Sequence, residues 1–141
     1  MQALCLQLRG ASAAVARSGV RHIAALPRFD FKLLKERREE MTSNIARRNA
    51  QGDPVAVLDL YEQYVQARTH WDEIQQNRTL TGEEMKKSRD AGRREALKEA
   101  GRLLKAEQSD VTARTTDLVA RLSAEASKLP NWVHPDVPGP G

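Results

Sequence analysis

Several features that other protein classes need are scarce in this chain of 141 residues. The single cysteine, Cys5, excludes an internal disulfide framework and a cysteine-rich zinc site. No stretch approaches the roughly 18 consecutive apolar residues of a membrane-spanning helix, so we expect no membrane insertion. Aromatic residues make up only 4% of the chain, which disfavours a thick globular core. Abundant alanine, glutamate, lysine, leucine and arginine indicate long helices instead.

Acidic residues are absent from the first 28 positions, and the first one is Asp30. The same segment contains four arginines and much alanine, a composition typical of a mitochondrial transit peptide. A disordered basic tail and a surface helix are the alternatives. The run Arg21-His22-Ile23-Ala24 resembles a matrix-protease cleavage site. We therefore expect residues 1–28 to act as a transit peptide, with cleavage between 21 and 30, and the mature protein to lie in the mitochondrial matrix.

The net charge of +4 is confined to this leader. Removing its four arginines from the 23 basic residues leaves 19, which equals the 19 acidic residues of the chain. Residues 29–141 are therefore formally neutral. The pI near 9.5 of the whole chain consequently gives no argument for nucleic-acid binding.

The rest of the chain reads as one helical unit, residues 29–129, followed by an extended, proline-rich exit segment, residues 130–141. We predict helices at about 31–49, 54–79 and 83–128. Asp30 suits the N-cap of the first helix. At the first break, Gly52 suits a C-terminal cap, Asp53 an N-cap and Pro54 the first helical position. At the second break, Thr81 and Glu84 match a capping box.

Apolar residues in the second and third predicted helices recur at helical spacing. In the third helix they repeat every seven residues, which is typical of a coiled coil. A second series continues this heptad but contains Gly101 and Gln108, so the seam is imperfect. The expected seam comprises Tyr61, Tyr64, Trp71, Leu97, Leu104, Val111, Leu118 and Leu122. The predicted fold is all-α: a long antiparallel two-helix coiled-coil hairpin with a short N-terminal helix at its base and an extended C-terminal exit segment.

Positive charge gathers around the predicted turn of the hairpin. Residues 78–105 hold nine basic and five acidic residues, a net charge of +4, whereas residues 29–77 and 106–141 each sum to −2. A basic face on a rigid arm can bind phosphates. A solvated face with acid–base pairs, such as Glu95 with Lys98 or Asp90 with Arg94, is the alternative. The candidate RNA-binding residues, chosen on charge, are Arg78, Lys86, Lys87, Arg89, Arg93, Arg94, Lys98, Arg102 and Lys105.

No constellation for catalysis or metal binding is visible. The chain offers no glycine-rich phosphate loop, no paired catalytic acids and no nucleophile with a base. No cluster of further potential metal ligands accompanies His70 or His134 in the sequence, so each histidine is expected to be structural. We expect no metal and no cofactor in this chain, and no serine activation or tRNA charging by the chain alone.

The C-terminal sequence LPNWVHPDVPGPG resembles the segment that ends the N-terminal tRNA-binding arm of seryl-tRNA synthetases. In that family a leucine or isoleucine, Pro-Asn, two variable residues, His-Pro, a variable residue and Val-Pro lead into the catalytic domain. The matching positions are Leu129, Pro130, Asn131, His134, Pro135, Val137 and Pro138. The resemblance covers residues 29–141, although within the helices it is a resemblance of pattern only.

The resemblance implies that the arm binds the long variable arm of serine tRNA, recognising backbone and shape more than bases. It also implies that a class II catalytic domain would follow, whereas this sequence ends at Gly141. A fragment or short isoform of a mitochondrial serine–tRNA ligase and a free-standing arm both fit. The alternative function is a non-catalytic coiled-coil partner or regulator that docks on a synthetase or another mitochondrial protein. The expected partner is serine tRNA, and a full-length seryl-tRNA synthetase is left open as a second partner.

Overall fold

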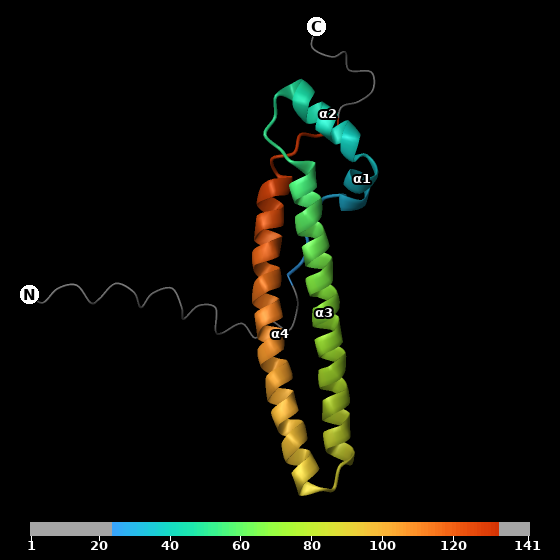
Figure 1. Ribbon diagram of the computed structural model, residues 1–141, viewed down its shortest axis with the longest axis vertical. Helices are drawn as coiled ribbons and strands as arrows, with labels where there is room; N and C mark the ends of the chain where they lie inside the picture. Colours follow the sequence, from blue (N-terminus) through green and yellow to red (C-terminus); the bar gives the residue numbers. More distant parts are fainter. Residues whose placement is uncertain (1–23, 133–141) are drawn as a thin grey trace, which may run out of the picture.

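The computed structural model describes residues 24–132, and every element of secondary structure within that range is a helix. Two long helices, α3 (Pro54–Lys87) and α4 (Ala91–Ala126), lie side by side as a hairpin joined by residues 88–90 (Figure 1). Two short helices, α1 (Phe31–Glu36) and α2 (Arg38–Arg48), lie at the opposite end of this pair. The predicted all-α hairpin with a short helical base is confirmed.

The hydrophobic core lies along the α3–α4 seam in two separate clusters. The larger one, at the base, joins α1 and α2 to both long helices, and Leu34, Val57 and Leu122 are fully buried there. The smaller one, halfway along the arm, consists of Trp71, Ile74 and Val111, with Leu104 packed against it. Because burying one such aliphatic or aromatic side chain contributes about 1.5–3 kcal/mol, most of the stability of the arm resides in its base half.

The predicted seam residues do lie between the helices, with a gradient along the arm. Tyr64, Trp71, Val111, Leu118 and Leu122 are buried, whereas Tyr61, Leu97 and Leu104 are half-buried. Tyr61 stacks on Phe31 of α1, with ring centroids 4.7 Å apart. Thr115 is also buried at the seam, and its hydroxyl donates to the Val111 carbonyl at 2.7 Å. This bond satisfies the hydroxyl within its own helix, so a polar residue is accommodated in the core.

The turn of the hairpin lies at residues 88–90, and the prediction of a break at 79–82 was wrong. The Thr81 hydroxyl donates to the Asn77 carbonyl at 2.8 Å inside a continuous helix instead of capping a new one. Gly82 costs such a helix about 1 kcal/mol, which is too little to end it. Asp90 is the actual N-cap, because its carboxylate accepts from the backbone amides of Gly92 and Arg93. The arm helices therefore have 34 and 36 residues and pair along their whole length.

The base also departs from the predicted helix ends. The helix expected at 31–49 is divided at Arg37, where φ is −115°, and the third helix ends at Ala126 rather than 128. Asn49, in the left-handed region with φ 50°, caps α2 in place of Gly52. The predicted start of α3 is confirmed, with Asp53 as N-cap and Pro54 in the first turn.

Gly52 has a different role from the one expected, because it lies against the residues that follow α4. A Cβ atom at this position would come within 2.7 Å of Leu129 Cδ2 and 3.1 Å of the Lys128 carbonyl oxygen. Glycine thus permits the loop between α2 and α3 to approach the backbone at the end of α4. A Cβ atom at Gly82, in contrast, would meet nothing within 4 Å.

The two glycines provide a matched test of the continuous α3. We expect Gly82→Ala to raise the free energy of unfolding by about 0.5–1 kcal/mol, because alanine is favoured over glycine inside a helix. Gly52→Ala should lower it by about 1–3 kcal/mol through overpacking. Urea unfolding followed by circular dichroism measures both changes. A loss of stability in Gly82→Ala would contradict a helix that runs through residue 82.

Candidate nucleic-acid interface

The connection at the tip of the arm is short and capped on both sides. The Ser88 backbone amide donates to the Glu84 carbonyl at 2.9 Å and closes α3. Two residues later the Asp90 carboxylate accepts from the Gly92 amide at 3.4 Å and the Arg93 amide at 3.1 Å, which opens α4. These bonds satisfy backbone groups that helix ends leave without partners. The tip therefore has a defined shape on which side chains can be presented.

The candidate RNA-binding residues are all exposed, but the structure brings only some of them together. Arg78 precedes the end of α3 by nine residues, and Lys105 follows the start of α4 by 14 residues. At 1.5 Å per residue, Lys105 lies about 21 Å along the arm from the start of α4. Arg102 lies one turn nearer to the tip. The residues at or near the turn are Lys86, Lys87, Arg89, Arg93, Arg94 and Lys98.

Ion pairs neutralise only a minority of these cations. Within the described range, ion pairs join Arg93 to Glu84 at 3.4 Å, Lys98 to Glu95 at 3.2 Å and Arg102 to Glu99 at 3.1 Å. The expected pair of Lys98 with Glu95 is thus present, whereas Asp90 caps α4 rather than pairing with Arg94. The cations that make no ion pair with any residue of 24–132 are Arg78, Lys86, Lys87, Arg89, Arg94 and Lys105.

The two helix ends at the tip act on these cations in opposite ways. Lys86 and Lys87, in the last turn of α3, complement the partial negative charge of a helix C-terminus. The first turn of α4 contains no acidic residue, and Arg93 and Arg94 stand near its partial positive end, where cations are unfavourable. The Asp90 carboxylate at the N-cap offsets part of this repulsion, and the first turns of α1 and α3 likewise contain no acidic residue. The summed positive field at the tip attracts anions.

The seam near the tip is polar, in contrast to the base. None of residues 75–110 is buried. Gln108 donates to the side-chain oxygen of Gln75 across the arm at 2.7 Å, and Arg78 donates to the side-chain oxygen of Gln108. Gln108, the imperfection in the predicted heptad, is therefore a seam residue that pairs by hydrogen bonds. Arg78 is engaged by this contact, which separates it from the freely solvated cations of the turn.

One apolar feature of the outer arm was not predicted. Leu80 and Leu103 are 50% and 63% exposed, and they border a shallow hollow of about 410 Å³ together with the half-buried Leu104. Polar and small side chains complete its lining: Asn77, Thr81, Glu84 and Ala100. The available signal was the position of Leu103, which lies beside the heptad series rather than in it.

The exit segment begins as a clamped structure at the base. Leu129 is buried in the base core, and the Asn131 carbonyl accepts a hydrogen bond from the Asn44 side-chain nitrogen at 3.0 Å. The Arg37 guanidinium carbon lies 5.4 Å from the centre of the Trp132 ring, in cation–π geometry. Sequence reasoning did not single out Arg37 or Asn44. The other predicted exit residues, His134, Pro135, Val137 and Pro138, lie outside the described residues.

The described part of the chain adds no sign of a metal site. His70 is exposed and lies 3.0 Å from Glu107 on α4, and no group of three metal-ligating side chains occurs among residues 24–132. No helix in the same range has the length and apolarity to cross a bilayer.

The fold and the basic tip define the chain as a coiled-coil arm, and comparison with known families places it more closely. The seryl-tRNA synthetase N-terminal domain model matches residues 29–133. Because this match covers well over half of the chain, the protein belongs to the family of seryl-tRNA synthetase N-terminal domains. It confirms the resemblance read from the exit segment.

Curated relatives agree with this assignment. The chain is 28% identical over 110 residues to a serine–tRNA ligase of Treponema denticola, an alignment that covers 78% of this chain and 26% of the relative. It is 29% identical over 106 residues to a serine–tRNA ligase of Treponema pallidum, covering 75% and 25%. The chain thus spans about a quarter of the length of these relatives. No solved structure gives a significant match.

Proposed function

We propose that this chain is a tRNA-binding arm that holds serine tRNA by its backbone and shape, through the basic turn between α3 and α4. The observation that carries the proposal is the group of cations at the tip without ion pairs among the described residues, Lys86, Lys87, Arg89 and Arg94. The family assignment supports tRNA as the class of ligand.

The distribution of charge favours one mode of approach. The net charge of +4 in residues 78–105 lies in the outer part of the arm, whereas residues 29–77 and 106–141 each carry −2. Phosphates are therefore attracted to one end of a rod whose longest helix, at 36 residues, is about 54 Å long. Such a polarised rod approaches a nucleic acid with its tip and turns its less attractive base away from it.

The residue types at the tip favour backbone contacts over the reading of bases. No aromatic residue occurs between Trp71 and Trp132, so the outer arm offers no ring on which a base can stack. Long lysine and arginine side chains reach phosphate oxygens at several angles, and such contacts position a nucleic acid without specifying its sequence. The specificity of this arm would then depend on the shape of the RNA.

Neutralising the four cations tests this proposal directly. We expect the change of Lys86, Lys87, Arg89 and Arg94 to glutamine to weaken serine-tRNA binding strongly at low salt. The slope of log affinity against log salt should become shallower by about 3, because each lost phosphate contact removes about 0.7–0.9 from it. Filter binding or gel shift over 50–200 mM salt measures both quantities, with a serine tRNA lacking its variable arm as a second ligand.

A matched control changes four basic residues of α1 and α2, which are exposed and make no ion pair within residues 24–132: Lys32, Arg38, Arg47 and Arg48. This variant has the same net charge as the tip variant but keeps the tip intact. It should retain nearly all of the affinity and the salt slope. Equal losses in the two variants would show a diffuse charge effect and would reject the tip as the binding site.

For the cellular location, we propose the mitochondrial matrix. The support is the arginine-rich, acid-free composition of residues 1–28, which suits import. Fusing these residues to a fluorescent protein should direct it to mitochondria. The same fusion with its four arginines changed to glutamine should remain outside, and import of both fusions alike would contradict the proposal.

A protein-docking role is the second candidate, and the hollow beside Leu103 is the observation that favours it. The seam itself is unavailable for this purpose, because Val111, Leu118 and Leu122 are buried inside the hairpin. Leu103→Asp should then abolish RNA-free co-purification with a seryl-tRNA synthetase while leaving the helical content unchanged. If Leu103→Asp still co-purifies with the synthetase, docking through this hollow is rejected. If the tip variant is also defective in RNA binding, tRNA binding is then the one function of the two that is supported.

A further inference from the structure

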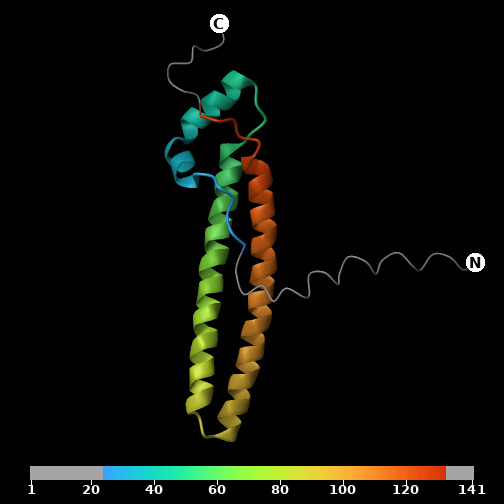
Figure 2. The same ribbon diagram turned by 180° about the vertical axis from the view of Figure 1, so that it is seen from behind.

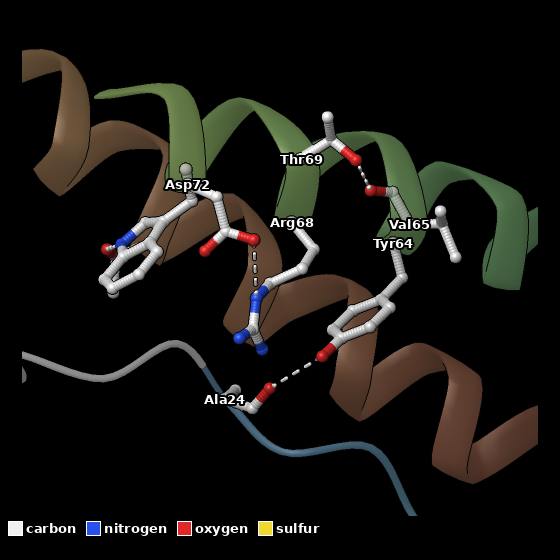
Figure 3. Close-up of polar contacts among 8 residues, drawn as sticks. Ala24, Tyr64, Val65, Arg68, Thr69 and Asp72 are labelled. Atoms are coloured by element: carbon white, nitrogen blue, oxygen red, sulfur yellow. Dashed lines mark hydrogen bonds and ion pairs between the residues drawn. The ribbon is translucent and has the colours of Figure 1, made fainter. Parts of the chain in front are cut away.

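Residues 24–30, which precede the first helix, run along the base half of the arm beside α3 and α4 (Figures 1 and 2). The Tyr64 hydroxyl of α3 donates to the Ala24 carbonyl at 3.3 Å, across 40 residues of sequence (Figure 3). Tyr64 is only 6% exposed, and the Ala24 carbonyl is the one acceptor that its hydroxyl has among residues 24–132. Removing Ala24 would leave this polar group without its acceptor, which destabilises the folded state.

The rest of this segment also packs against the fold. Leu26 and Phe29 are partly buried against the base core, and the Phe29 ring lies 5.0 Å from the Phe31 ring. The Phe29 amide donates to the Pro27 carbonyl at 2.9 Å, which forms a tight turn before α1. Ala25 and Arg28, in contrast, are exposed. The large apolar side chains of Leu26 and Phe29 thus face the core, whereas Ala25 and Arg28 face outward, as in a structural element of the fold.

The neighbourhood of Ala24 is polar and organised. The Arg68 guanidinium extends toward the Tyr64 hydroxyl and the Ala24 carbonyl, while its Nε donates to the Asp72 carboxylate at 3.4 Å (Figure 3). A hydrogen bond to Tyr64, opposed by some desolvation and assisted by the charge of Asp72, raises the pKa of Arg68 above its usual value. The Tyr64 hydroxyl therefore holds the beginning of the segment, with the Arg68 side chain beside it, in addition to the apolar packing of Leu26.

We infer that residues 24–30 are a permanent strap of the mature arm, and that the leader is removed by cleavage of the bond between Ile23 and Ala24. The processing part of this inference rests on the proposed import into mitochondria, whereas the strap does not. The composition of the sequence allows cleavage anywhere from 21 to 30. A cut after Leu26 or Arg28 would remove the acceptor of Tyr64 and part of the base core, whereas a cut before Ala24 preserves both.

The sequence before the Ile23–Ala24 bond suits hydrolysis by a processing peptidase. Arg21 stands three positions before the bond, in the run Arg21-His22-Ile23-Ala24. Hydrolysis by a matrix processing peptidase consumes one water, breaks the peptide bond and leaves a carboxylate on Ile23 and an ammonium group on Ala24.

Variants of the full chain test the strap. We expect Leu26→Ser to lower the unfolding temperature by about 4–8 °C, which is the usual effect of a single lost core contact in a domain of this size. Ala25→Ser, at the neighbouring exposed position, should leave it within 1 °C. A chain of residues 24–141 should unfold at the same temperature as residues 1–141, and a chain of residues 29–141 clearly lower. Equal unfolding temperatures for the chains that begin at 24 and 29 would overturn the strap.

N-terminal sequencing tests the processing site, using the full chain incubated with a matrix extract. The expected new N-terminus is Ala24, and Arg21→Gln should slow its appearance at least tenfold. An N-terminus at any residue from 25 to 30, or no cleavage, would overturn the assignment. The proposed RNA role is tested separately, because the chains that begin at 24 and 29 should bind serine tRNA equally well below their unfolding temperatures. If neither chain binds serine tRNA, the proposed function fails, but the comparison of unfolding temperatures that tests the strap is unaffected.

Discussion

The pairing of α3 with α4 along their seam is the contact on which the rest of the structure depends. Neither helix can bury its apolar stripe alone, and long isolated helices are marginal in water. The pairing is not uniform: aliphatic and aromatic residues fill the base half, whereas Gln75, Gln108 and Arg78 meet by hydrogen bonds farther out. Because the base half supplies most of the burial, the outer half is free to carry charge that a packed core would exclude.

This gradient explains which parts of the fold could be predicted from the sequence. The heptads that include Leu118 and Leu122 indicated the hairpin correctly, because their side chains form the core. The turn was misplaced for the same reason. Beyond Ile74 no apolar stripe marks the continuation of α3, so a local Thr81–Glu84 pattern and Gly82 looked like a helix boundary. The true cap, Asp90, carries an equally short signal, and only the need for two arms of similar length distinguishes the two positions.

The candidate site was predictable in charge but not in geometry. The count of basic residues between 78 and 105 indicated exposure correctly, since so many like charges cannot be buried. Which cations are neutralised depends on rotamers and on the position of the turn, and Arg78 is occupied by Gln108 although the sequence groups it with the others. Neither the strap, residues 24–30, nor the contacts that hold the start of the exit segment at the base could be predicted from sequence patterns. Tyr64 with Ala24, and Asn44 with Asn131, are contacts across 40 and 87 residues, which no local period encodes.

The two ends of the arm impose different requirements on its rigidity. A rod about 50 Å long displaces its tip by about 4 Å for each 5° of tilt at its base. Long lysine and arginine side chains at the tip can absorb a shift of that size, whereas a larger tilt would carry the basic turn away from a given phosphate. The base therefore needs contacts that fix the direction of the arm relative to the chain leaving it. The close approach of Gly52 to Leu129, the Asn44–Asn131 hydrogen bond and the Arg37 guanidinium over Trp132 all lie at that junction. Their position fixes the direction of the arm relative to residues 129–132.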